Sequence, residues 1–157
     1  MKKPAILALT ALALLQSAPA AAKTDVFTNM FAWWNTAFKT EGGFNAPSFR
    51  KYFTEDATLT LEGKQAISGI DNWVSHFQAI QASGAEVEIV VPFKTVFQKG
   101  DKIYSYHVIR SRRAGKASCS LAAGHAVVKG GKIASITLVR ATLDASKAPL
   151  DPQCWTD

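Results

Sequence analysis

The stretch "DATLTLEGKQAISGIDNWVSHFQAIQAS", residues 56–83, decides the fold. Its first part, 56–63, alternates in polarity and is rich in residues that favour strands, which predicts a β-strand. Its last part, 68–83, repeats apolar side chains every three to four residues, which predicts an amphipathic helix. Ser68 followed three residues later by Asp71 resembles a capping box at the start of this helix. A strand therefore leads directly into a helix.

The residues before this stretch predict two more helices. Residues 24–39, "TDVFTNMFAWWNTAFK", place aromatic side chains on one helical face. Thr24 is the expected cap, and Asp25 suits the positive end of the helix dipole. Residues 47–53 predict a short second helix. The N-terminal half is thus mainly helical.

The residues after it alternate as strands do and are separated by glycine turns such as "KGDK" and "KGGK". Pro92 indicates a bulge or an edge position in the first of these strands. The four expected strands cover residues 87–98, 102–113, 117–129 and 132–143. No helix follows them, which disfavours a parallel βαβ sheet. The pattern predicts an α+β fold in which one strongly bent, mainly antiparallel sheet wraps around the helices and leaves a conical pocket.

The N-terminal residues have the pattern of a signal peptide. Two lysines precede an apolar run at 5–16, and small residues follow at 17–22. Cleavage after Ala20 or Ala22 is expected, and the apolar run is too short for stable membrane insertion. We therefore expect a secreted or periplasmic protein with a signal peptide at 1–22 and a single domain at 23–157.

The formal net charge of +6 does not indicate a nucleic-acid-binding protein. The lysines and arginines are spread along the chain, and the only cluster is Arg110, Arg112 and Arg113. A small anionic ligand or a soluble surface accounts better for the charge. No nucleic-acid partner is expected.

The chain has two cysteines, Cys119 and Cys154. In an oxidising compartment an isolated pair is usually a disulfide, which here would tie the C-terminal tail to a strand. A catalytic thiol is the alternative interpretation. No spacing of Cys and His resembles a metal site, and no phosphate loop or dinucleotide motif is present, so we expect neither a metal nor a cofactor.

Three segments resemble the nuclear transport factor 2-like superfamily, in particular its SnoaL-like and ketosteroid isomerase-like branch. They are "FAWWNTAF" (31–38), the stretch from Phe49 to Phe77, and "GGKIASITLVRATLD" (130–144). "FTEDAT" followed by "GIDN" is the most specific part. The resemblance implies a cone-shaped domain in which three N-terminal helices pack in the concave face of the sheet. It also implies a homodimer. It says little about the reaction, because one fold hosts many functions.

The sequence departs from two mechanisms of that superfamily. The general base of the steroid isomerases falls on Leu61, and the adjacent Glu62 is expected on the other face of its strand. The acid of epoxide hydrolase-like members falls on Ala141. Scytalone dehydratase-like members use histidines and tyrosines on sheet strands, which this chain also has.

Strand pairing determines which of these side chains share a face. The "KGGK" turn pairs Lys129 with Lys132, and so His125 with Ile136, and the bulkier face with His125 and Arg140 is the expected interior. The opposite face, rich in Ser, Ala, Gly and Thr, suits a dimer contact.

The preceding turn leaves two registers open. A two-residue "AG" turn sets Tyr104 opposite His125, with Tyr106 and Arg110 on the same face. A three-residue "AGK" turn brings His107 there instead. We favour the first register, because tyrosines suit a half-polar cavity.

These residues predict acid–base chemistry without a cofactor. His125 or His107 is the candidate base, and Tyr104 or Tyr106 the candidate proton donor. The expected enzyme is a lyase, dehydratase or isomerase acting on a small aromatic or polycyclic molecule. The candidate ligand-binding residues are Arg110, Arg140, Trp34, Trp73, Phe77, Tyr52 and Asp56. A non-catalytic periplasmic binding protein and an assembly module are the alternatives.

Overall fold

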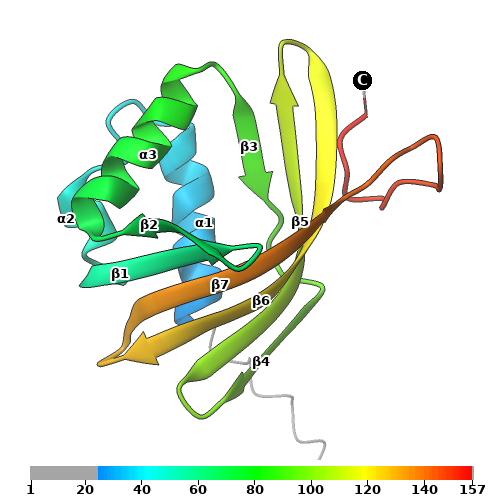
Figure 1. The fold of residues 1–157 in the computed structure, drawn as a ribbon. Helices are drawn as coiled ribbons and strands as arrows, with labels where there is room; N and C mark the ends of the chain where they lie inside the picture. Colours follow the sequence, from blue (N-terminus) through cyan, green and yellow to red (C-terminus); the bar gives the residue numbers. More distant parts are fainter. Residues whose placement is uncertain (1–24, 157) are drawn as a thin grey trace, which may run out of the picture.

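The computed structural model describes residues 25–156, which form three helices and a seven-stranded sheet (Figure 1). The helices are α1 (Val26–Phe38), α2 (Ala46–Phe49) and α3 (Ile70–Ala82). The strands are β1 (Phe53–Leu61), β2 (Lys64–Ser68), β3 (Glu86–Ile89), β4 (Thr95–Lys99), β5 (Lys102–Arg113), β6 (Lys116–Lys129) and β7 (Lys132–Thr142). The expected signal peptide at 1–22 and Thr24 lie outside the described residues. No described helix has the length and apolar character needed to cross a membrane.

The sheet is mixed, with strand order β2-β1-β7-β6-β5-β3, and β4 also pairs with β5. Strand β1 runs parallel to β7, and every other pair is antiparallel. The parallel pair brings the first strand of the chain beside the last, and apolar side chains of the helices and of the sheet share one core. Figure 1 shows the helices together on one side of the curved sheet. The α+β class is therefore confirmed.

Three predicted boundaries are wrong. Strand β2 was not predicted, and β1 begins at Phe53, so the second helix is shorter than expected. The single strand expected at 87–98 is two strands, β3 and β4, separated by a cis Val91–Pro92 peptide bond. Both pair with β5, which is long enough to hold one at each end.

Helix α1 is fixed at its start and near its centre. The Asp25 side chain accepts a hydrogen bond from the Thr28 backbone N–H at 2.8 Å, so Asp25 is the N-cap. The Asn35 amide donates to the Ile89 carbonyl at 2.7 Å and accepts from its N–H at 3.0 Å. These bonds hold α1 against β3, while its aromatic face enters the core.

Helix α3 begins without the predicted capping box. Its N-cap is Gly69, which makes no side-chain capping bond, while Ser68 ends β2. The positive φ of Gly69, 81°, favours glycine because it has no Cβ. The Trp73 indole donates to the Ala57 carbonyl at 3.0 Å. This bond ties α3 to β1.

The register of β5 and β6 confirms the two-residue turn, because Tyr104 lies opposite His125. The register of β6 and β7 begins as predicted, with Lys129 opposite Lys132, but a bulge follows between Val127 and Val128. His125 therefore pairs with Thr137 rather than with Ile136. One extra residue moves the rest of a strand to the opposite face.

The interior face of β6 is consequently the small-residue face, contrary to the prediction. Ala122 and Ala126 are fully buried, and Ala126 pairs with Ile136 in the core. A Cβ on Gly124 would collide with the Thr137 carbonyl oxygen and press on the Leu138 side chain. Larger side chains from the helices and β7 fill this space. The predicted use of this face for a dimer contact is therefore wrong.

The C-terminal tail, residues 143–156, packs on the outer side of β5 and β6. Its anchor is the predicted disulfide between Cys119 and Cys154, whose Cα atoms are 5.6 Å apart. Arg110 donates to the Gln153 carbonyl at 3.0 Å, and its guanidinium lies 5.0 Å from the centre of the Trp155 ring. Arg110 thus helps to hold the C-terminal tail against the sheet.

Candidate ligand pocket

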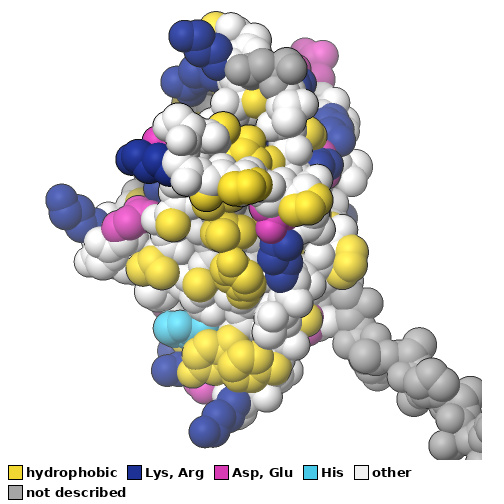
Figure 2. Space-filling view, turned by 90° about the vertical axis from the view of Figure 1, so that its right-hand side faces the viewer, with side chains coloured by type: hydrophobic (Ala, Val, Ile, Leu, Met, Phe, Trp, Pro, Cys, Tyr) yellow, Lys and Arg dark blue, Asp and Glu magenta, His cyan; other side chains and the backbone are white. Residues whose placement is uncertain are grey.

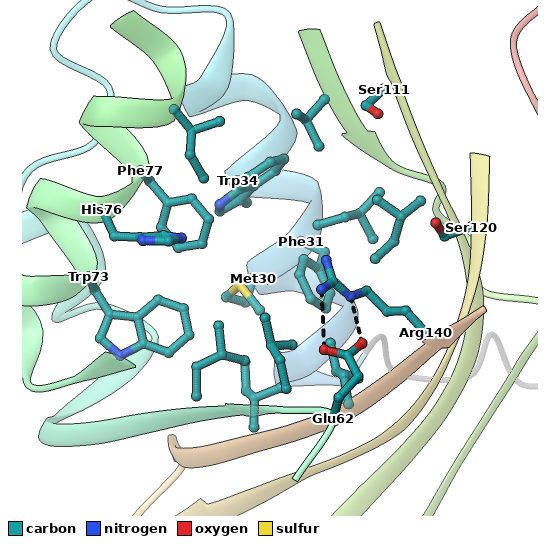
Figure 3. Close-up of a pocket in the computed structure, with 18 of the residues that line it drawn as sticks. Met30, Phe31, Trp34, Glu62, Trp73, His76, Phe77, Ser111, Ser120 and Arg140 are labelled. Atoms are coloured by element: carbon teal, nitrogen blue, oxygen red, sulfur yellow. Dashed lines mark hydrogen bonds and ion pairs between the residues drawn. The ribbon is translucent and has the colours of Figure 1, made fainter. Parts of the chain in front are cut away.

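A cavity of about 480 Å³ lies between α1, α3 and the inner face of the sheet (Figure 3). Its inner wall is aromatic, because Phe31 and Trp34 of α1 meet Trp73 and Phe77 of α3. The volume falls within the range of natural ligand pockets. Trp34 is 3% exposed, and its indole N–H has no hydrogen-bond partner among the described residues. The wall therefore offers apolar surface and one buried donor.

An ion pair lies at the mouth of the cavity. Arg140 of β7 donates through Nε to Oε1 of Glu62 at 3.0 Å and through a terminal nitrogen to Oε2 at 3.3 Å. Figure 3 shows this two-pronged contact at the edge of the cavity. The side chains are 43% and 48% exposed, so the pair is half solvated. The hydrogen bond from Arg140 lowers the pKa of Glu62, which is ionised at neutral pH.

Hydroxyl groups line the sheet side of the same mouth. They come from Ser111 of β5, Ser118 and Ser120 of β6, and Thr142 of β7. Ser111 lies opposite Ser118, and Ser120 lies opposite Thr142 with 3.4 Å between their oxygens. Because these side chains alternate onto the inner face, they form a polar band beside an apolar wall.

His76 of α3 also lines the cavity. It is exposed, and its ring meets Phe77 edge-on at 5.0 Å. Figure 3 places His76 across the cavity from the Glu62–Arg140 pair. A histidine and a carboxylate therefore flank one apolar space, an arrangement that supports proton transfer to and from a bound molecule.

The structure brings four of the predicted ligand-binding residues to this cavity: Arg140, Trp34, Trp73 and Phe77. Tyr52 does not line it and instead stacks on Trp33 with 5.2 Å between ring centres. Asp56 is exposed and accepts a hydrogen bond from Thr54 at 2.8 Å, which lowers its pKa. Neither residue lines the cavity: Tyr52 precedes β1 and packs on α1, and Asp56 of β1 points to solvent.

The predicted placement of Tyr104, Tyr106 and His125 in the pocket is wrong. On β5 the core side chains are Ile103, Ser105 and His107, so the alternating tyrosines point to the outer face. Tyr104 stacks on the exposed Phe97 at 5.0 Å and meets His125 at 5.5 Å. The unpredicted bulge in the β6–β7 pairing accounts for the error.

His107 points inward but does not line the cavity. It is 0% exposed, between Phe93 at 4.9 Å and Phe31 at 5.6 Å, measured between ring centres. Neither ring nitrogen has a hydrogen-bond partner among the described residues. Burial lowers its pKa to about 4, so the ring is neutral at pH 7.

Arg110 is also outside the cavity. It pairs with Glu88 at 2.7 Å and holds the tail through Gln153 and Trp155. Arg112 donates to the Thr156 carbonyl at 3.2 Å and lies over the same Trp155 ring. These contacts assign both arginines a structural role.

Glu62 was not predicted to line the pocket, because the alternation of side chains along β1 was assumed to continue through this residue. β1 ends at Leu61, and Glu62 has a left-handed backbone with φ 46°. The turn carries its carboxylate back to Arg140. A glutamate directly before the Gly of "LEGK" was the available sequence signal for such a turn.

Residues 25–156 contain no cluster of three His, Cys, Asp or Glu side chains suited to a metal ion. Within this part of the chain, the polar groups at the cavity are a glutamate, an arginine, a histidine and hydroxyls. They can donate and accept hydrogen bonds and exchange protons.

Comparison with solved structures identifies the architecture. An NTF2-like protein from Exiguobacterium sp. superposes with a TM-score of 0.61 at 17% identity, covering 74% of this chain and 98% of that one. The chain has the nuclear transport factor 2-like fold. A ketosteroid isomerase-like protein from Catenulispora acidiphila, in complex with trimethylamine, gives a TM-score of 0.55 at 16% identity over 69% of this chain and 82% of that one.

Other proteins with this fold include enzymes. An epoxide hydrolase of the LEH-like type from Mycobacterium tuberculosis gives a TM-score of 0.58 at 11% identity, covering 74% of this chain and 83% of that one. No family model and no curated protein matches the sequence. At such identities the nuclear transport factor 2-like fold is shared, while each protein's chemistry is its own.

Proposed function

We propose that the protein binds a small hydrophobic molecule, aromatic or polycyclic, in the cavity between α1, α3 and the sheet. The observation that carries this proposal is a cavity of about 480 Å³ with aromatic walls and a single ion pair at its mouth. Apolar walls supply binding free energy, and a few polar groups orient the ligand. The volume accommodates two or three fused rings.

A panel of aromatic and terpenoid compounds tests the proposal by thermal shift and by tryptophan fluorescence. Trp34 and Trp73 line the cavity, so a bound ring should change their emission. Ser120→Phe should fill the mouth and weaken binding at least about tenfold. Val127→Phe, on the outer face of the same strand, is the matched control and should bind normally. Equal binding by both variants would place the ligand elsewhere.

Catalysis without a cofactor is the second candidate function, as a lyase, dehydratase or isomerase. His76 and Glu62 support it, because they flank the cavity from α3 and from the turn after β1. A carboxylate or an imidazole in that position can remove a proton from a bound molecule, and the other can return it. The low pKa of Glu62 keeps it in the basic form at neutral pH.

Turnover of any panel compound allows this candidate to be tested. Glu62→Gln or His76→Gln should then lower kcat by about 10²–10⁴-fold, with the pH–rate profile changed on one limb. Arg50→Gln, at a similar ion pair outside the cavity, should leave turnover unchanged. A ligand that binds without chemical change supports the binding protein instead.

We further propose that the protein works outside the cytoplasm, in the periplasm or as a secreted protein. The signal-peptide pattern at residues 1–22 and the Cys119–Cys154 disulfide support this location. Intact mass of protein from the periplasmic fraction should give a mature start near Ala21 or Lys23. A full-length mass that includes Met1 would contradict the proposal.

A further inference from the structure

The mouth of the cavity is rich in hydrogen-bond donors on one side of Arg140. A guanidinium carries five N–H groups, and Glu62 accepts only from Nε and one terminal nitrogen. The remaining N–H groups are therefore available to a second acceptor. In Figure 3, Glu62 and Ser120 lie on opposite sides of the Arg140 side chain. Arg140 and Ser120 line the same cavity, so a molecule bound there can approach the guanidinium from the side that Glu62 does not occupy.

The groups on that side are also able to donate. Ser120 and Thr142 face each other across β6 and β7, and Thr142 is two residues beyond Arg140 on the same face. Each hydroxyl has one donor, and Arg140 adds a permanent positive charge. One hydroxyl donor is used in the Ser120–Thr142 contact, and the other, together with the guanidinium, matches the two acceptor oxygens of a carboxylate. The opposite side of the cavity is mainly aromatic, and His76 is the titratable group there.

We propose that the ligand of this cavity is a hydrophobic carboxylic acid, bound with its apolar body against Trp34 and Trp73. Its carboxylate then lies between Arg140 and the hydroxyls of Ser120 and Thr142. This inference rests on the proposed binding function and specifies its ligand class. The net charge is +6 for the full sequence and stays positive when Lys2 and Lys3 leave with the expected signal peptide, which further favours the approach of an anion.

The two members of the ion pair then have opposite effects on ligand binding. Arg140 attracts the ligand carboxylate, whereas Glu62 repels it and competes for the same guanidinium. Loss of Arg140 should weaken binding of the acid, and loss of the Glu62 charge should strengthen it. A purely structural ion pair would give the same direction for both, because either change breaks the same bonds.

The experiment uses 2-naphthoate and its uncharged analogue 2-naphthamide, titrated by calorimetry and tryptophan fluorescence. In the wild type the acid should bind about five- to tenfold more tightly than the amide, a moderate gain because Arg140 is half exposed. Arg140→Gln should remove this preference, and Glu62→Gln should increase acid affinity about threefold. Arg50→Gln is the matched control, because Arg50 binds Glu55 with two similar hydrogen bonds outside the cavity.

The affinity for 2-naphthamide distinguishes the proposed binding function from the inference that the ligand is a carboxylic acid. If Arg140→Gln still binds the amide normally while losing the acid preference, the carboxylate inference is supported. Equal affinity of the wild type for acid and amide, or an unchanged acid preference in Arg140→Gln, overturns it and leaves the binding function intact. If neither probe binds the wild type, the proposed binding function and the inference both fail.

Discussion

His107 is a neutral imidazole enclosed by aromatic rings. It is 0% exposed, and burial lowers its pKa to about 4, compared with about 6.5 in an unfolded chain. Between these values the unfolded state binds a proton that the folded state does not. Stability therefore rises with pH across this window and is lost as the pH falls from 6.5 toward 4. The loss at pH 4 amounts to about 3 kcal/mol.

Replacement of His107 by Phe tests this linkage. The variant keeps an aromatic ring but cannot titrate, so it should lose less stability between pH 7 and pH 4.5 than the wild type does. Urea unfolding at several pH values measures both slopes. Carboxylates with lowered pKa values, such as Glu62, give a slope in the same direction, so the difference between the two proteins isolates His107. His76→Phe, at an exposed position, is the control, and identical slopes for wild type and His107→Phe would refute the assignment.

At the level of single elements, the sequence predicted what depends on local periodicity. The helices at 24–39 and 68–83 and the three last strands correspond to α1, α3, β5, β6 and β7. The register of Tyr104 opposite His125 followed from a two-residue turn and is confirmed. Each of these features depends on side chains that are close together in the chain.

Features that depend on one irregular residue were not predictable in the same way. The bulge at Val127/Val128 reverses the faces of β6 relative to β7, and no glycine or proline marks it. Pro92 was predicted to mark a bulge or an edge position, and it lies in the break between β3 and β4, which both pair with β5 at the edge of the sheet. The aromatic wall of the pocket was predicted, since the helices have no comparable irregularity, whereas on the sheet side Arg140 was predicted and the hydroxyl groups were not.

The C-terminal tail is the element most dependent on a covalent tether. The disulfide closes a loop between residues 35 apart in sequence, and in the chain-entropy model such a loop stabilises the fold by about 4 kcal/mol. The Cys119→Ser/Cys154→Ser double variant should lose about that much free energy of unfolding. Wild type with a reductant should behave like the variant. A loss below about 1 kcal/mol would show that the Arg110 and Trp155 contacts suffice.

At the scale of the whole molecule, an apolar face is exposed on the outer side of the sheet (Figure 2). Phe97 is 55% exposed, Val139 is 57% exposed and Tyr106 is 38% exposed. Phe97 lies on β4, Val139 on β7 and Tyr106 on β5. Tyr106 and Val139 both pair with Ala123 of β6, so they lie in one row across the sheet. Large side chains that gather in this way on an exposed surface mark an interaction site.

We propose that this face joins two copies of the chain in a homodimer. A sheet face can pair with its own copy through a two-fold axis, so each contact occurs twice, once from each copy. Phe97→Glu places a charge at the patch and should convert the dimer to a monomer in light scattering. Gln98→Glu, the next residue on the same strand, points to the other side and should leave the dimer intact. A wild-type monomer at high concentration, or a dimer that persists in Phe97→Glu, would exclude this face, because a buried carboxylate without a partner opposes association.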